Sequence, residues 1–380
     1  MLYVVIEPAN FMSMESSVLF HRPTVALTIL ASIFFSVFAI PEMIPDAEAA
    51  GSRDKRKIKK LKKQNRALKN TVAVLQQQLA FARRPVPDPV PFVKMVTVGN
   101  VGNATDAGNT SEASVYGAVP YEFQIGKYEV TLAQYAAFLN AVAATDTNSL
   151  YNASMASDLN SAGIQQSGAD GSHTYTVIGS GNRPVTYVSW FDAARFCNWL
   201  HNGRPTGAQD AGTTERGAYT LDGATSGVGI TRVWAAKYWI PSEDEWYKAA
   251  YHQPSSDGGD PDSYWLYPMG SNTVPGNNIS GTPNQANHFN GTYSVTQSGS
   301  KDVNQNYLTD GGSYEGSASF YETFDQGGNV GEWNDAAVGS FRGLRGGSWG
   351  SSENNMRSYD RSNINPVNEN INIGFRVASP

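Results

Sequence analysis

The residue types that most often carry catalytic chemistry are few in this chain and form no recognisable group. Cys197 is the single cysteine, so the sequence offers no intramolecular disulfide and no metal site built from several thiolates. The five histidines lack the His-x-x-x-His or His-x-Asp/Glu spacing that an iron site often shows; they are His21, His173, His201, His252 and His288. No glycine-rich phosphate loop, Walker motif or nucleophile elbow is present in the sequence.

Side chains suited to hydrogen bonding are concentrated near the end of the chain, in "RGGSWGSSENNMRSYDRSNINPVNENINIGFRVA" (Arg345–Ala378). Asparagine tolerates left-handed turns, so these amides are explained either as loop filler or as a binding face. Arg345 and Trp349 are expected to anchor the segment. Together with those two, the candidate ligand-binding residues are Ser351, Ser352, Asn354, Asn355, Tyr359, Asp360, Asn363, Asn365, Asn368, Asn370 and Asn372.

The elements that must position this segment follow from local patterns. Residues 121–130 alternate as a strand does, and a helix over 131–143 follows with Thr131 as its N-cap. Residues 184–203 predict a short strand and then a helix that ends at Gly203, and residues 238–251 repeat that order. Ser242 and Glu245 have the spacing of a capping box. Residues 257–316 are rich in Gly, Ser, Asn and Asp, which predicts long ordered loops.

The first 50 residues resemble a targeting segment. An apolar run from Val25 to Ile40 is followed by Ala47-Glu48-Ala49, a small-x-small cleavage pattern. The run is shorter than the roughly 20 residues that a membrane span needs. We therefore predict an exported protein, periplasmic, secreted or at the cell surface, with residues 1–50 as a signal peptide. An uncleaved membrane anchor is the alternative.

Residues 51–84 are predicted to be a basic coiled-coil stalk. Twelve Lys or Arg and one acidic residue lie between Arg53 and Arg84. Apolar residues repeat with heptad spacing over residues 58–79, and Asn65 occupies a core position that favours a parallel dimer. A homodimer through residues 58–79 is one interpretation, and a single amphipathic helix or a lipid-facing surface is the other. Because the chain is predicted to be exported, nucleic acid is not expected as a partner.

A proline-rich spacer, residues 85–93, separates this stalk from a domain predicted to span residues 94–380. Alternate prolines in "RRPVPDPVPF" cannot continue a helix and favour an extended chain. From residue 85 onward the sequence has 15 basic and 28 acidic residues, so the domain is acidic where the stalk is basic.

Five phrases of the domain resemble, in order, the signature segments of the formylglycine-generating enzyme (sulfatase-modifying factor) family. They are "IGKYEVTLAQYAAFLNAV", "RPVTYVSWFDAARFCNWL", "WIPSEDEWYKAA", "GGNVGEWN" and "LRGGSW…IGFRV". The resemblance implies an α+β, C-type-lectin-like fold with little regular secondary structure, here preceded by an N-terminal helix or coiled coil. Enzymes of that family oxidise a sulfatase cysteine with oxygen, and other members have no known activity.

The resemblance also locates the two cysteines that hold copper in the enzymes. The matching positions are Ser351 and Met356. Copper(I) selects soft sulfur donors, and a hydroxyl with a thioether does not replace two thiolates. We therefore expect no copper and no oxidase activity, with a sulfatase-modifying oxidoreductase or another metal-dependent oxidase as the alternative.

Calcium is the cofactor that the resemblance implies. Asn329 and Glu332 in "GGNVGEWN" match calcium positions of the family, and Asn287 in "ANHF" resembles the start of a second calcium site. Hard oxygen donors on a glycine-rich turn suit this ion. The alternative is that Asn329 and Glu332 only hold the turn by hydrogen bonds.

The Asn-rich segment is similar, further, to the variable region of retroelement-diversified C-type-lectin proteins. The varied positions would then be Gly350, Ser351, Ser352, Tyr359, Asp360, Ser362, Ile364, Val367 and Ile371. Together these features predict a non-catalytic binding module, with a protein or glycan as the ligand.

Overall fold

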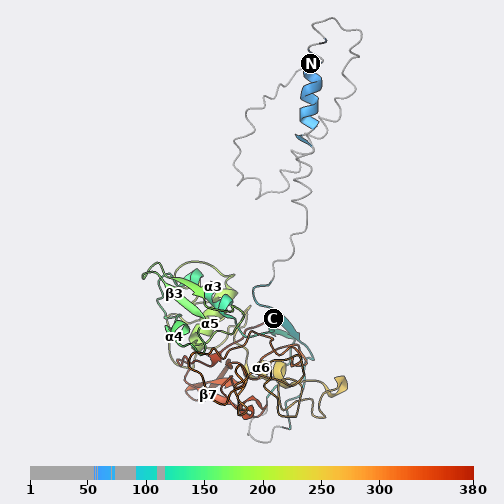
Figure 1. Cartoon of the computed structure of the whole chain (residues 1–380), viewed down its shortest axis with the longest axis vertical. Helices are drawn as coiled ribbons and strands as arrows, with labels where there is room; N and C mark the ends of the chain where they lie inside the picture. Colours follow the sequence, from blue (N-terminus) through green and yellow to red (C-terminus); the bar gives the residue numbers. More distant parts are fainter. Residues whose placement is uncertain (1–54, 56, 58, 70, 73–90, 109–115) are drawn as a thin grey trace. The chain divides into compact units, whose positions relative to one another are not determined.

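The computed structural model describes residues 55, 57, 59–69, 71–72, 91–108 and 116–380 (Figure 1). One compact unit spans Pro91–Pro380. The predicted targeting segment, residues 1–50, and residues 85–90 of the spacer lie outside the described residues. Within the described ranges, no helix combines the length and the apolar character that crossing a bilayer requires.

Part of the basic stretch is helical, since residues 59–69 form α-helix. Leu61 and Leu68, two members of the heptad seam, are both exposed in the single chain. Several other seam positions, including Ile58, Leu75 and Leu79, lie outside the described residues. The coiled-coil dimer therefore stays a prediction.

Residues 91–108 and 116–380, the described part of the compact unit, contain three small sheets with few regular elements between them. One antiparallel sheet has the order β1 (Met95–Val98), β2 (Phe123–Gly126), β9 (Ala378–Ser379). A hairpin joins β3 (Ile164–Ser167) and β4 (Thr174–Val177). The third sheet has the order β7 (Ser362–Ile364), β6 (Phe341–Arg345), β5 (Gly331–Val338), β8 (Ile373–Gly374), in which β8 alone runs parallel to its neighbour.

Among the described residues of the compact unit, three of four α-helices begin at capping boxes that the local sequence provides. These are α3 (Leu132–Val142) capped by Thr131, α5 (Trp190–His201) capped by Ser189, and α6 (Glu243–Tyr251) capped by Ser242. In each, the cap side chain accepts the N3 backbone N–H while the N3 side chain accepts the N–H of the cap residue. The predicted caps at Thr131 and Ser242 are confirmed. A short helix, α4 (Ser154–Ser157), and two 3-10 helices, η3 (Ser255–Asp257) and η4 (Glu353–Met356), complete the set.

The prediction of a short strand before α5 and before α6 was wrong. Pro184 forms one isolated bridge with Thr131, and Trp239 forms one with Ala378. Tyr187 has a φ of 58°, which interrupts an extended backbone between Pro184 and the helix. Residues 258–330, all of them described, contain no named helix or strand, as the glycine-rich and asparagine-rich composition predicted.

The main core lies where α3 and α5 meet. Phe138, Phe196 and Trp199 are buried there in edge-to-face and tilted ring contacts with centroids 5.3–5.8 Å apart. Cys197 has no exposed surface, as expected of a structural thiol on the apolar face of this helix. Phe375, near the end of the chain, packs on Phe196, so the last residues belong to this core.

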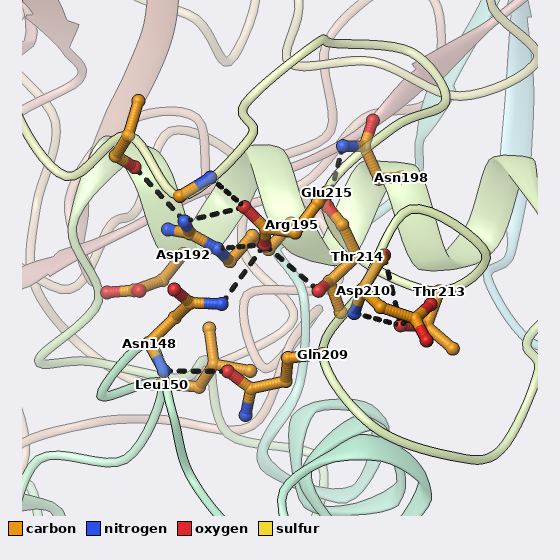
Figure 2. A network of polar contacts seen from close by, with 12 residues as sticks. Asn148, Leu150, Asp192, Arg195, Asn198, Gln209, Asp210, Thr213, Thr214 and Glu215 are labelled. Atoms are coloured by element: carbon orange, nitrogen blue, oxygen red, sulfur yellow. Dashed lines mark hydrogen bonds and ion pairs between the residues drawn. The ribbon is translucent and has the colours of Figure 1, made fainter.

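A buried polar network attaches the loop after α5 to that helix (Figure 2). Arg195 donates from Nε and Nη2 to the two oxygens of Glu215 at 2.7 and 3.1 Å. Asn198 donates to the carbonyl of Thr214 at 2.7 Å and accepts the backbone N–H of Tyr219 at 2.8 Å. The loop needs no regular structure of its own, because side chains of α5 satisfy its backbone groups.

Candidate binding cavity at the C-terminal segment

The segment after β6 leaves the third sheet and returns to both of its edges. Ser362 of β7 pairs with Leu344 of β6, and Ile373 of β8 pairs with Gly331 of β5. The departure is a turn at Gly346, where φ is 95° and a Cβ atom would lie 2.5 Å from the carbonyl oxygen of Gln326. A side chain does not fit there, so glycine is required to start the segment.

A cavity of about 170 Å³ lies where the segment folds back over the sheet. Its floor is formed by residues of β5, β6 and β8, and its walls by the segment itself. The lining residues are Gly331, Leu344, Arg345, Gly346, Gly347, Ser348, Ser351, Asn355, Asp360, Ser362, Asn372 and Ile373. Since a water molecule takes about 30 Å³ of liquid volume, the space accommodates a small polar group or one side chain of a partner.

Five of the predicted ligand-binding residues meet at this cavity, namely Arg345, Ser351, Asn355, Asp360 and Asn372. They come from positions up to 27 residues apart in the sequence. The structure therefore brings together a subset of the asparagine-rich segment, and that subset could not be separated from the rest by sequence pattern.

Short hydrogen bonds order the polar wall of the cavity. Asn355 Nδ2 donates to Asp360 Oδ2 at 2.9 Å, and Asn372 Nδ2 donates to Ser348 Oγ at 3.1 Å. Ser348 Oγ also lies 3.0 Å from Ser351 Oγ. A primary amide carries two donors and an acceptor with two lone pairs, so these bonds use only part of each side chain's capacity.

Arg345 forms the cavity floor but its guanidinium is already engaged. Its Nε donates to Glu243 Oε1 at 2.7 Å, and its Nη1 donates to the backbone carbonyls of Ser358 and Asp360 at 2.9 and 3.0 Å. The residue is 2% exposed. Arg345 therefore holds the segment in place, which is the anchoring role expected from the sequence.

Trp349 also has the environment of an anchor. Its ring stacks on Tyr307 with centroids 4.9 Å apart and planes 12° apart, and 4% of the residue is exposed. Its backbone N–H donates to the carbonyl of Asn329 at 2.9 Å. Because Trp349 is buried and does not line the cavity, it supports the segment from inside.

The remaining predicted residues lie outside the cavity. Asn354, Asn363, Asn365, Asn368 and Asn370 are exposed, and Ser352 and Tyr359 are partly buried. Asn365 Oδ1 accepts the backbone N–H of Val367, which is the loop-stabilising role that asparagine often has. The side chains of Asn354, Asn363, Asn368 and Asn370 have no hydrogen-bond partner among the described residues.

Ser348 lines the cavity but is not among the residues predicted from the sequence. It lies inside the quoted phrase RGGSW, between a glycine with a φ of 66° and the buried Trp349. That position, between a turn that only glycine accommodates and an aromatic anchor, was the signal that could have identified it.

The two positions that match the copper cysteines do not share one environment. Ser351 lines the cavity, whereas Met356 has no exposed surface and packs with Tyr267, Met269 and Ala286. Cys197, the one thiol, is buried in α5, and burial raises the pKa of this thiol well above its ordinary value. A hydroxyl at the cavity and a thioether in the interior do not fit a thiolate copper site.

The residues predicted to bind calcium are occupied by other partners. Both oxygens of Glu332 accept hydrogen bonds from Arg376 at 2.6 Å, and Trp246 Nε1 donates to Glu332 Oε2 at 2.7 Å. Asn329 Oδ1 accepts from Asn287 Nδ2 and from the backbone N–H of Thr309, both at 3.1 Å. Because each of these oxygens already accepts a hydrogen bond, calcium binding by Asn329 and Glu332 requires the present donors to move away.

Asn287 differs from that pair, because its buried Oδ1 has no hydrogen-bond partner among the described residues. Its Nδ2 is used by the carbonyl of Tyr307 at 2.8 Å and by Asn329. The structure thus brings Asn287 and Asn329 together and leaves one amide oxygen unpaired. Calcium at this place stays a prediction, which a titration tests.

Buried charge surrounds Glu332. Glu129 and Asp325 are close enough to influence one another, and Arg376 is the cation among them. Burial, then the Asp325 carboxylate, raise the pKa of Glu129 well above its ordinary value, and burial raises the pKa of Asp325 to about 6. Burial and the neighbouring carboxylates thus disfavour the charged form of Glu129 within this cluster.

The whole compact unit matches one protein family. The sequence model of the sulfatase-modifying factor enzyme 1-like domain matches residues 81–380. The chain belongs to this family. The family assignment confirms the predicted α+β fold class with few regular elements.

Three solved structures are similar to this member of the family. CarF is 21% identical, with 76% of this chain and 98% of CarF covered and a TM-score of 0.43. Treponema denticola variable protein 1 is 21% identical, with 75% and 94% covered and a TM-score of 0.40. PvdO from Pseudomonas aeruginosa is 17% identical, with 76% and 91% covered and a TM-score of 0.40. A search among curated proteins found no match.

Proposed function

We propose that this sulfatase-modifying factor family member is a non-catalytic binding module that takes a protein or glycan ligand at its C-terminal cavity. The observation that carries the proposal is the convergence of Ser351, Asn355, Asp360 and Asn372 on one space of about 170 Å³. Small hydroxyl and amide groups offer donors and acceptors in many directions, which suits recognition of a polar ligand.

The chemistry of the same residues argues against turnover. The cavity is lined by hydroxyl, amide, carboxylate and guanidinium groups, and by no thiol. Arg345 pairs with Glu243 at an N–O distance of 2.7 Å and donates to two backbone carbonyls, so its guanidinium is committed to structural contacts. What remains is an ordered set of hydrogen-bonding groups on a rigid floor.

The exposed asparagines extend this surface. Asn354, Asn363, Asn365, Asn368 and Asn370 present amides to solvent around the segment that forms the cavity. We propose that a macromolecular ligand inserts a small polar group into the cavity and contacts these amides outside it. Variation of residues such as Tyr359 and Ser362 would then change the ligand, as in a diversified binding protein.

The remaining parts of the proposal concern delivery of the module. We include three features in the same proposal. Segment 1–50 directs export, the basic stalk pairs through residues 58–79, and calcium stiffens the domain. The described helix at 59–69 and its exposed Leu61 and Leu68 support a pairing surface, because apolar residues at heptad spacing are left without a partner in the single chain.

The direct test is to fill the cavity. Full-length protein and the variant Ser351→Phe are applied to defined peptide and glycan arrays, with Ser300→Phe, at an exposed position in another loop, as the matched control. We expect a ligand whose binding is lost in Ser351→Phe and kept in Ser300→Phe. Equal binding by all three proteins would contradict the use of the cavity.

A second experiment addresses the enzymatic alternative. A sulfatase-type cysteine peptide is incubated with the full-length protein, copper and oxygen, and the peptide mass is followed. We expect an unchanged peptide. Conversion of the cysteine to an aldehyde would show that the module is an enzyme and that the proposal is wrong.

A further inference from the structure

A second and larger cavity, of about 490 Å³, lies away from the C-terminal segment. It is bordered by the residues just before and inside β2 and by the loop that precedes α6. The lining residues are Tyr121, Glu122, Phe123, Arg232, Trp234, Ala236, Trp239 and Pro380, and none of them lines the first cavity. Its volume is within the range of about 300–1,000 Å³ that is typical of small-molecule sites.

Aromatic side chains dominate this cavity, and one of them is left in water. Trp234 is 99% exposed and Tyr121 is 40% exposed, while Phe123 and Trp239 are buried below them. A tryptophan normally gains stability by burying its large apolar ring. A fully exposed indole beside a cavity with aromatic walls therefore offers a flat apolar surface to a ligand.

The single cationic side chain that lines the cavity is paired with a buried carboxylate. The Arg232 guanidinium lies 4.4 Å from the centroid of the Trp239 ring and donates to Glu245 Oε1 at 2.9 Å. Tyr121 OH donates to the same oxygen at 2.7 Å, and the Glu245 side chain has no exposed surface. The positive charge of Arg232 is thus balanced by a carboxylate beneath it.

The paired guanidinium disfavours charged ligands on the side of the cavity that Arg232 and Trp239 form. A ligand cation would compete with Arg232 for the face of Trp239. A ligand anion would approach the exposed carboxylate of Glu122 and would find Arg232 already paired. Donor capacity remains, because a guanidinium has five N–H groups and Arg232 donates only to Glu245 and Tyr121 among the described residues.

We infer that this cavity is a second binding site, independent of the first, for a neutral saccharide. A sugar ring has C–H faces that pack on an indole and hydroxyl edges that hydrogen-bond to guanidinium and carboxylate groups. Trp234 supplies the flat surface, while Arg232 and Glu122 supply the polar contacts. A purely apolar ligand would cover the free N–H groups of Arg232 without pairing them, which costs free energy.

The inference is tested by calorimetric titration of the full-length protein with three neutral probes: maltohexaose, cellohexaose and chitohexaose. We expect at least one to bind with a dissociation constant of about 1 mM or tighter. Trp234→Ala should weaken that binding by about tenfold or more, because it removes the apolar platform. Phe341→Ala, which removes another exposed aromatic ring outside this cavity, should leave it unchanged.

Three outcomes would overturn the inference. The first is the absence of binding heat for all three probes at about 10 mM, well above the expected dissociation constant. The second is equal saccharide binding by Trp234→Ala and the unmodified protein. The third is Trp234-dependent binding of a peptide with the sequence of residues 83–92 without any saccharide binding, which would make the cavity a site for proline-rich peptides.

Discussion

Arg376 and Glu332 form an ion pair in which neither side chain has any exposed surface. Arg376 donates from Nε and Nη2 to the two carboxylate oxygens at 2.6 Å each, in the bidentate geometry that makes such pairs strong. Arg376 Nη1 also donates to the carbonyl of Gly126 at 2.8 Å. The pair thereby connects the end of the chain to strand β5 of the third sheet and to strand β2 of the first sheet.

Removal of Glu332 should destabilise the fold strongly. Glu332→Ala leaves Arg376 buried without its bidentate partner, and breaking a buried pair from one side costs about 3–5 kcal/mol. We expect this loss in the free energy of unfolding measured with urea. Glu322→Ala, which removes a surface partner of Lys127 that is 73% exposed, is the control and should cost about 1 kcal/mol or less. Similar losses in both variants would contradict the structural role of Glu332.

Truncation of Trp349 should also destabilise the protein. Trp349→Ala removes a buried ring that stacks on Tyr307, and large-to-small changes of this kind cost about 3–5 kcal/mol. Thermal and urea unfolding would measure the loss. An unchanged stability with altered ligand binding would instead restore Trp349 as a ligand contact.

Stability should fall as the pH rises from about 6.5 to 8. Burial raises the pKa of Asp192 and of Asp335 to about 7, far above the value near 3.9 of an unfolded aspartate. The folded state therefore binds more protons than the unfolded state in this window, and its extra stability is lost as the pH passes through the folded pKa. For two such groups the decline is on the order of 1–2 kcal/mol.

The groups with the opposite effect titrate mainly outside this window; burial lowers the pKa of His201 and of His288, as it does for the two residues below. Burial lowers the pKa of His252 to about 4, so that residue adds stability as the pH rises from 4 to about 6.5. Burial lowers the pKa of Lys248 to about 8, so its contribution begins near pH 8. Urea unfolding at several pH values gives the slope, and Asp192→Asn should flatten it. A stability that increases from pH 6.5 to 8 would refute the assignment.

Cys197 should react with a thiol reagent only after unfolding. The residue has no exposed surface, and burial raises the pKa of its thiol well above the ordinary value, which lowers the thiolate fraction. Because Cys197 is the single cysteine of the chain, all thiol labelling comes from this residue. We expect labelling with an aromatic disulfide reagent to follow the urea transition. Rapid labelling of the native protein would show that the α5 core opens.

Calcium is tested by calorimetric titration and by thermal unfolding with calcium or with a chelator. The family resemblance predicts one ion that is lost in the double variant Asn329→Ala, Glu332→Ala. The hydrogen bonds of these residues predict that an ion, if bound, requires Arg376 to move away from Glu332. Asn287→Ala serves as the comparison, because its unpaired Oδ1 is the acceptor available without rearrangement. If calcium gives no binding heat and does not stabilise the protein, the cofactor prediction is wrong.

Local sequence determined the helices and the irregular connections of this protein. Thr131 with Gln134, and Ser242 with Glu245, form their capping boxes within four residues, so no distant contact is needed to specify where these helices begin. The composition of residues 257–316 likewise predicted irregular connections, and residues 258–316 form no strand or helix. The five ordered phrases were enough to indicate the family and its fold.

Tertiary structure alone decided what the polar residues do. Glu332 and Asn329 look like calcium ligands in an isolated turn, but Arg376 lies 44 residues later and neutralises the carboxylate. Asn355 and Asn372 line one cavity while Asn363 and Asn368 face solvent, although all four lie in the same asparagine-rich stretch. The role of a short polar side chain depends on which partners the fold brings within about 3 Å, and this distance is set by contacts between residues far apart in the sequence.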